Sequence, residues 1–219
     1  MITILPDSPN ITIANDVLPT LEKSYAEMRK LLPELPEALD IWLIHDFPMD
    51  FSGVSGFAYS PSIITIDFNP DFTDKQLQQK ALRATVFHEA YHLAQGHTSE
   101  EGSASYTSAL DSAIYEGMAT VFERTYTDLK EPYSDYDATD KLLLQKWQSE
   151  LAKITPEEFL ANDGTLWRQW AFYDESDEFG WKLYKTGAWL VDRYLEKSGD
   201  DILDIVHMPA ADIVAVVTS

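Results

Sequence analysis

The segment "TVFHEAYHLAQ", residues 85–95, carries the side chains best suited to chemistry in this chain. His88 and His92 are four residues apart, so on a helix they project from one face about 6 Å apart, close enough to bind one metal ion. Glu89 follows the first histidine and would stand at the edge of that face. A carboxylate there can act as a general base beside a metal-activated water. The spacing therefore predicts a zinc site with hydrolytic chemistry.

A third metal ligand must come from elsewhere, because a catalytic zinc site usually has three protein ligands. The chain has no cysteine, which leaves histidine and carboxylate donors. His97 lies five residues after His92 and fails the spacing of His-Glu-x-x-His-x-x-Gly-x-x-His, so we expect a surface or helix-end residue there. Glu116 is the better candidate, because a carboxylate among small and apolar residues is costly unless it is ligated or paired. The alternative is an ion pair of Glu116 with Arg124 or Arg83.

Capping signals and periodicity predict the helices that position these residues. The zinc pattern lies in a helix that we expect to begin at Thr73, with Gln76 three residues on, and to end at Gly96. An earlier helix is expected after Asp16, with an apolar stripe over residues 18–32. Downstream, the pattern predicts further helices over residues 103–127, 139–153, 156–161 and 178–198.

Two apolar segments, "DIWLIHDF" and "SIITIDF", are short and rich in β-branched or aromatic residues, so both are expected to be strands. Between them, Gly53 and Gly56 indicate a flexible loop or a tight hairpin. The expected fold class is α+β. It consists of a small N-terminal β-sheet packed on a zinc-bearing helix, with a mostly helical C-terminal lobe.

Length and composition predict a single domain, because 219 residues with 45% hydrophobic content can bury one sizeable core. The prolines are scattered rather than gathered into a linker, and no repeat is evident. We therefore expect one domain over residues 1–219, with a mixed α/β lobe at 1–72, the zinc-binding helices at 73–127 and a helical lobe at 128–219.

The strong acidity argues against a nucleic-acid partner. The net charge is -21 and the pI is about 4.3, whereas binding to the phosphate backbone needs a cationic face. No run approaches the roughly 20 apolar residues of a membrane span, and the first residues do not resemble a secretory signal. The expectation is a cytoplasmic protein, or a secreted or periplasmic one if a leader has been removed. The sequence indicates no oligomeric state.

The His-Glu-x-x-His pattern followed by Glu-Gly-Met-Ala at 116–119 resembles the gluzincin metallopeptidases. In these enzymes, which include thermolysin-like and aminopeptidase N-like proteins, the third zinc ligand is a glutamate on a later helix. Tyr115 stands where the aminopeptidases have asparagine. The arrangement is more similar still to a group of bacterial predicted zinc-dependent proteases. In that group a glycine-containing strand pair like "GVSGFAYSPSIITIDF" precedes the zinc helix and a Tyr-x-x-Gly segment like "LYKTGAWLVDRYLE" follows it.

The resemblance implies a zinc-dependent metallopeptidase that hydrolyses peptide or protein substrates. His88, His92 and Glu116 would hold Zn²⁺. Glu89 would accept a proton from water and deliver it to the departing amine. Tyr184, in the Tyr-x-x-Gly segment, would stabilise the oxyanion, although a purely packed tyrosine is an equal alternative. Related enzymes bind the peptide along an edge strand, a place that "SIITIDF" is expected to take.

Two other functions stay open at this level. The same ligands would support a zinc hydrolase that acts on a non-peptide amide or ester. The fold could also serve as a non-catalytic binding module that presents its acidic surface to a partner.

Overall fold

A computed structural model describes residues 2–6, 17–46, 49, 51–99, 106–137, 139–172 and 180–219. The chain divides into two compact units. The first contains residues 1–102 and 122–129, and the second contains residues 103–121 and 130–219. The single domain and the three lobe boundaries expected from the sequence stay predictions.

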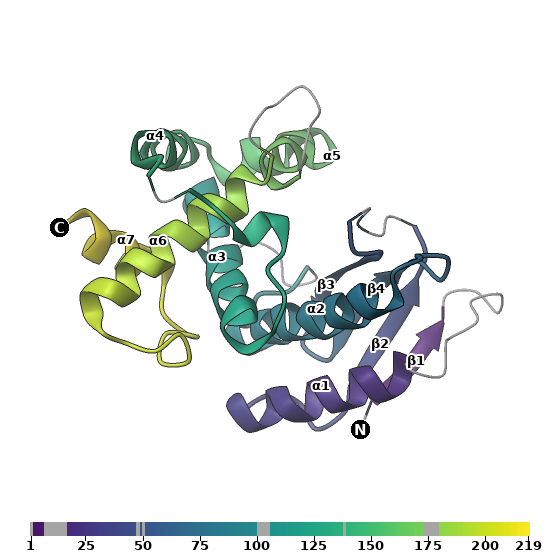
Figure 1. The fold of residues 1–219 in the computed structure, drawn as a ribbon. Helices are drawn as coiled ribbons and strands as arrows, with labels where there is room; N and C mark the ends of the chain where they lie inside the picture. The colour runs from purple at the N-terminus through teal and green to yellow at the C-terminus, as the bar shows by residue number, and fades with distance from the viewer. Residues whose placement is uncertain are drawn as a thin grey trace. The chain divides into compact units, whose positions relative to one another are not determined.

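The first unit is built on a mixed four-stranded sheet (Figure 1). Its strands lie in the order β1 (Ile2–Pro6), β2 (Leu39–Ile44), β4 (Ile63–Phe68), β3 (Val54–Ser60). β1 and β4 run parallel to β2, and β3 pairs antiparallel with β4. β2 and β4 confirm the two expected strands. β1 was not expected, because it is short and ends at a proline, and its pairing with β2 is a long-range interaction.

β3 and β4 form a tight hairpin, joined by Pro61 and Ser62. The hairpin alternative was therefore correct and the flexible loop was wrong. The expectation that "SIITIDF" is the edge strand was also wrong, because β4 lies between β2 and β3 and is hydrogen-bonded on both sides. Among the described strands, β3 and β1 are the edges.

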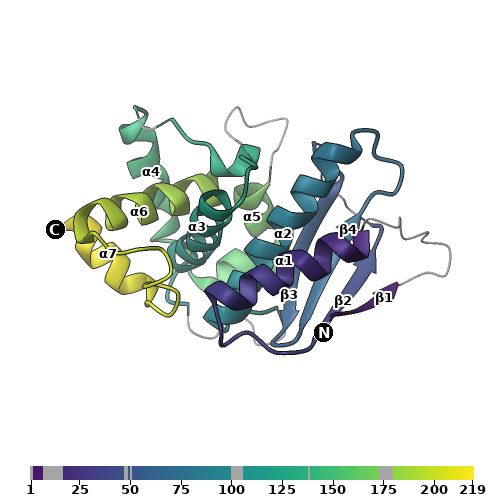
Figure 2. The same ribbon diagram turned by 60° about the horizontal axis from the view of Figure 1, so that its bottom comes forward.

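Two helices, α1 (Val17–Leu31) and α2 (Lys75–Gln95), lie on the same face of this sheet (Figures 1 and 2). α1 confirms the first expected helix, and its expected cap Asp16 lies outside the described residues. The expected stripe was wrong at Leu18, which is 39% exposed. The buried face of α1 instead consists of Val17, Leu21, Ser24, Tyr25 and Met28.

α2 carries the zinc pattern and ends at Gly96, as expected. Gly96 adopts a left-handed conformation with φ 70°, which glycine accepts without steric cost. The N-cap is Asp74 rather than Thr73, because the Asp74 carboxylate accepts the Leu77 N–H at 2.9 Å. Every residue from Val86 to Ala94 is buried, so the zinc pattern lies on a helix that is covered all round.

The second unit is helical. It holds most of α3 (Ala109–Tyr126), then a short 3-10 turn η1 (Pro132–Ser134), α4 (Lys141–Leu151), α5 (Pro156–Ala171), α6 (Lys182–Ser198) and α7 (Ala210–Thr218). The helices expected at 139–153 and 178–198 are confirmed with shorter bounds. In the part of the chain that the structure describes, no helix is both long and apolar enough to cross a membrane.

Two helix predictions for this unit need correction, and one helix was missed. α3 begins at Ala109, because residues 106–108 are not helical, and residues 103–105 lie outside the described part. The helix expected at 156–161 does break there, but α5 resumes after residues 161–164, where Asn162, Asp163 and Gly164 have positive φ. α7 was not expected at all.

α3 and α6 touch backbone to backbone at two glycines. A Cβ on Gly187 of α6 would stand 1.7 Å from the carbonyl oxygen of Ala113, and a Cβ on Gly117 would stand 2.1 Å from the carbonyl carbon of Gly187. No side chain fits at that distance. The Glu-Gly-Met-Ala segment and the Tyr-x-x-Gly segment therefore meet at their glycines.

Substitution of Gly187 by alanine tests this contact. A glycine-to-alanine change inside a helix normally stabilises it by up to about 1 kcal/mol, but here the added methyl group should destabilise the protein by about 1–3 kcal/mol through overpacking. The measurement is chemical denaturation of Gly187→Ala beside the exposed α4 control Ser149→Ala. A variant as stable as the control would show that the two helices are not in contact.

Candidate metal centre

His88 and His92 lie one turn apart on α2 and point their Nε2 atoms at each other. The two Nε2 atoms are 3.2 Å apart. Both side chains are buried, with 7% of His88 and 4% of His92 exposed. Two ring nitrogens this close in a buried place need either a shared proton or a cation between them.

The other ring nitrogen of each histidine faces an oxygen. His88 Nδ1 lies 3.0 Å from Glu123 Oε2, and His92 Nδ1 lies 2.9 Å from Gln95 Oε1. These oxygens accept hydrogen bonds, so each Nδ1 carries the proton and donates it. In the neutral rings each Nε2 is then left with a lone pair. The two Nε2 lone pairs point at each other, which favours the binding of a cation between them.

Glu123 is fully buried, with 0% of the residue exposed. It lies in the last turns of α3, which belong to the first unit and pack on α2. There the Phe122 ring stacks with Phe87 at 5.9 Å and lies 4.7 Å from the Tyr91 ring. These aromatic contacts set the distance between the two helices and so hold the Glu123 carboxylate against His88.

Glu116 lies two turns before Glu123 on the same face of α3, because seven residues make close to two helical turns. One ligand atom from each of His88, His92 and Glu116 lies within 4.8 Å of the others. Glu116 is partly exposed. Arg83, one of the cations considered as its partner, forms a 3.0 Å ion pair with Glu27.

Two imidazoles and one carboxylate suit Zn²⁺, which binds nitrogen and oxygen donors in catalytic sites with one position left for water. The orientation of the imidazoles also fits, because metal-binding histidines usually donate their second N–H to a carboxylate or carbonyl oxygen. His88, His92 and Glu116 could therefore hold a zinc ion.

Glu89 is buried beside the histidines, with 6% exposed. The sheet approaches it closely at Gly56 of β3, where an added Cβ would lie 3.3 Å from the Glu89 Cγ and 2.6 Å from the Thr85 Cγ2. Gly56 is therefore the position at which β3 can pass directly over the Glu89 side chain. A larger residue there would push the strand away from α2.

Tyr184 lies in the first turn of α6, in an aromatic cluster of the second unit. Its ring centroid is 5.3 Å from that of Tyr133 and 6.1 Å from that of Trp181. It also lies one turn before Gly187, which touches the backbone of Gly117 next to Glu116. The ring contacts agree with a packing role, and its role at the oxyanion stays a prediction.

Two residues near the histidines were missed in the sequence, and the prediction for a third, His97, is confirmed. Glu123 and Gln95 bind the Nδ1 atoms, and the available signals were their spacing of seven residues from Glu116 and three residues from His92. His97 was expected to be a surface or helix-end residue. It does follow the end of α2, but its ring centroid lies only 5.1 Å from that of His92.

A charge-removing change at Glu123 tests its role behind His88. Glu123→Gln keeps the size and an accepting oxygen but loses the negative charge, so zinc affinity should fall about 10- to 100-fold. Competition with a chelating dye measures the affinity. Glu150→Gln on the exposed face of α4 is the matched control and should bind zinc like the parent protein. Unchanged affinity in Glu123→Gln would contradict the assignment.

Comparison with known proteins also points to zinc. The model of one family, described as "Predicted Zn-dependent protease (DUF2268)", matches residues 45–215, which include the histidine pair and Glu116. A search of curated proteins and a search of solved structures found no match to the chain. With most of its length matched, the chain belongs to the family of predicted Zn-dependent proteases.

Proposed function

We propose that this chain is a zinc-dependent metallopeptidase of the gluzincin type, with His88, His92 and Glu116 as the zinc ligands and Glu89 as the general base. The observation that carries the proposal is the arrangement of the imidazoles. Both Nδ1 atoms are held by oxygens, both Nε2 atoms converge, and one ligand atom from each histidine and from Glu116 lies within 4.8 Å of the others.

Bound zinc would supply a Lewis acid that polarises the substrate carbonyl and lowers the pKa of water toward neutrality. Glu123 keeps His88 in the tautomer that presents its Nε2 lone pair. The negative charge of Glu123 also makes the His88 Nε2 a better electron-pair donor to a metal ion. Gln95 orients His92 in the same way but brings no charge.

Glu89 moves the proton. Its carboxylate takes one proton from the attacking water as the new carbon–oxygen bond forms. It then gives that proton to the amide nitrogen as the carbon–nitrogen bond breaks, so that the amine leaves neutral. Burial beside Gly56 keeps bulk water away from this carboxylate.

The edge strand β3 is our proposed place for the peptide. Gly53 accepts the N–H of Asn69, so its carbonyl points toward the β4 side, and the directions alternate along the strand. The main-chain groups of Val54, Gly56 and Ala58 therefore point away from β4, where the Val54 carbonyl accepts the Ser52 hydroxyl at 3.1 Å and the Gly56 groups face the edge. A peptide added there would lie beside Glu89 and be held by main-chain hydrogen bonds with little demand on its sequence.

Two substitutions separate metal binding from catalysis. Glu89→Gln should retain zinc, because the residue is not a ligand, and should lose about 10²- to 10⁴-fold in kcat for peptide cleavage, because the base is gone. Glu116→Ala should lose zinc affinity itself. Metal analysis and a peptide-library digest measure both, with Glu150→Gln as the control.

Two outcomes would contradict the mechanism. One is full peptidase activity in Glu89→Gln. The other is full zinc content in Glu116→Ala. If the zinc-loaded parent protein cleaves small amides or esters but no library peptide, the non-peptide hydrolase is the correct alternative.

For the oxyanion we propose Tyr184. Tyr184→Phe keeps the ring contacts with Tyr133 and Trp181 and removes only the hydroxyl, so stability and zinc content should not change. Loss of one hydrogen-bond donor to the oxyanion should lower kcat about 10²- to 10³-fold with little change in KM. Steady-state kinetics measure kcat and KM separately. An unchanged kcat would leave Tyr184 as a packing residue only.

A further inference from the structure

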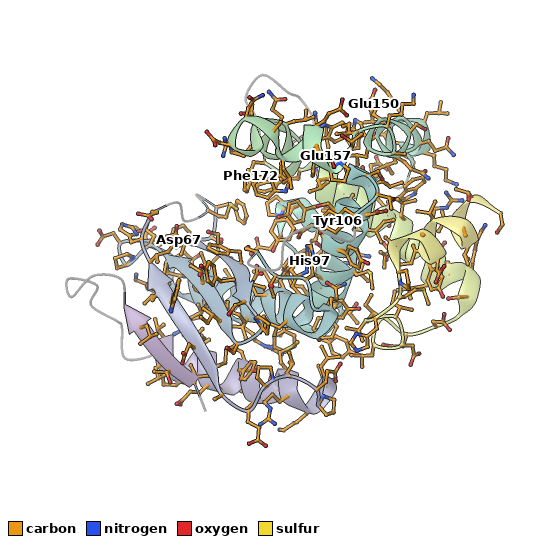
Figure 3. All side chains as sticks on the ribbon, turned by 180° about the vertical axis from the view of Figure 1, so that it is seen from behind. Asp67, His97, Tyr106, Glu150, Glu157 and Phe172 are labelled. Carbon is orange, nitrogen blue, oxygen red and sulfur yellow. The ribbon has the colours of Figure 1, made fainter. Side chains whose placement is uncertain are left out.

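A third imidazole stands next to the two proposed ligands. The ring centroids of His88 and His92 are 4.9 Å apart, and those of His92 and His97 are 5.1 Å apart. The His92 ring is therefore in contact with both of the other imidazoles. His97 differs from the other two in being partly exposed, and it is not part of the group of possible metal ligands found among the described residues. Figure 3 labels its position after the end of α2.

The main chain holds His97 on both sides. Before it, the left-handed Gly96 turns the chain back, and the His97 N–H donates to the His92 carbonyl at 2.9 Å. After it, Thr98 is buried, and the Ser99 N–H donates to the Ala58 carbonyl of β3 at 2.9 Å. The imidazole therefore stands at a fixed place between the end of α2 and the edge of β3.

The Ser99 bond also ends the open edge of β3. The Ala58 carbonyl is the last outward-facing acceptor before the register of β3 shifts between Ala58 and Ser60, and it is already occupied by Ser99. A peptide paired with Gly56 and the Val54 N–H cannot continue the ladder past Ala58. The main chain of the peptide must turn away from β3 there, and its N–H and C=O groups beyond that point need other hydrogen-bond partners.

We propose that His97 binds the substrate's main chain at the point where the peptide leaves β3. A neutral imidazole offers one donor and one acceptor, which suits a peptide group. The proposal rests on the proposed peptidase function and adds a substrate-binding residue to it. In this proposal His97 neither binds the metal nor transfers a proton. The bond that breaks is still the carbon–nitrogen bond of the peptide.

The rival role for His97 is support of the His92 ring, since the two rings are in contact. Two substitutions separate the roles, because each keeps one property of the imidazole. His97→Phe keeps a ring against His92 and removes both nitrogens. His97→Gln keeps one donor and one acceptor and removes the ring. His207→Phe, at an exposed histidine of the second unit, is the matched control.

Binding is measured in the Glu89→Gln background, which should hold a peptide without cleaving it. The probe is a fluorescein-labelled peptide that the parent protein cleaves, and the readout is its Kd by anisotropy together with zinc affinity by dye competition. We expect His97→Phe to raise the Kd about 3- to 10-fold, as for one lost hydrogen bond. His97→Gln should keep a Kd close to that of the Glu89→Gln protein with His97 intact. Zinc affinity should be unchanged in both His97 variants.

The opposite pattern would overturn the inference. If His97→Gln weakens zinc binding while His97→Phe behaves like the parent, the ring only supports His92. If neither variant changes the peptide Kd while the parent protein cleaves the peptide, His97 does not contact substrate and the peptidase function still stands. A zinc-loaded parent protein that neither binds nor cleaves any library peptide would overturn both.

Discussion

The hydrogen bond between the buried Glu123 carboxylate and His88 Nδ1 is the interaction on which the candidate site depends. A buried carboxylate is costly without a donor, and a buried imidazole has one N–H to give, so each group decides the orientation of the other. Once a neutral His88 ring donates through Nδ1, its Nε2 can only accept. His92, held by Gln95, is in the same state. With both rings neutral, the protein therefore holds two Nε2 acceptors 3.2 Å apart, a place that suits a cation.

Close backbone approach places the two carboxylates of the proposed chemistry. In the first unit, Gly56 lets β3 pass over Glu89 on α2. In the second unit, Gly187 of α6 contacts Gly117, the neighbour of Glu116. Neither approach leaves room for a side chain. Glycine in these two places thus has a packing reason, separate from any need for an unusual backbone conformation.

The segment that follows α2 contacts both His92 and the edge of β3. Gly96 reverses the chain so that His97 comes back beside His92, and Ser99 then occupies the last open carbonyl of β3. The same short segment therefore ends the zinc helix, places a third imidazole and closes one end of the strand edge. Family membership and the two imidazoles with Glu116 support zinc chemistry. The segment after α2 lies next to these imidazoles and limits how far a peptide can pair with β3.

Local spacing by itself determined the helix that carries the His-Glu-x-x-His pattern, because His88, Glu89, His92 and Gly96 act through i, i+4 geometry and capping within one element. It also indicated Glu116, through the cost of a carboxylate among apolar residues. Only the tertiary structure decided which carboxylate reaches His88, because Glu123 comes from another helix.

The edge strand was likewise decided by long-range pairing. The pattern of "SIITIDF" describes a strand without saying which neighbours it has, and the addition of β1 to β2 left β4 in the interior. The contact of His97 with His92 was not predicted, for a related reason. Its spacing excludes one known ligand pattern, but its position depends on a left-handed turn and on an anchor to β3, a contact between residues far apart in the sequence.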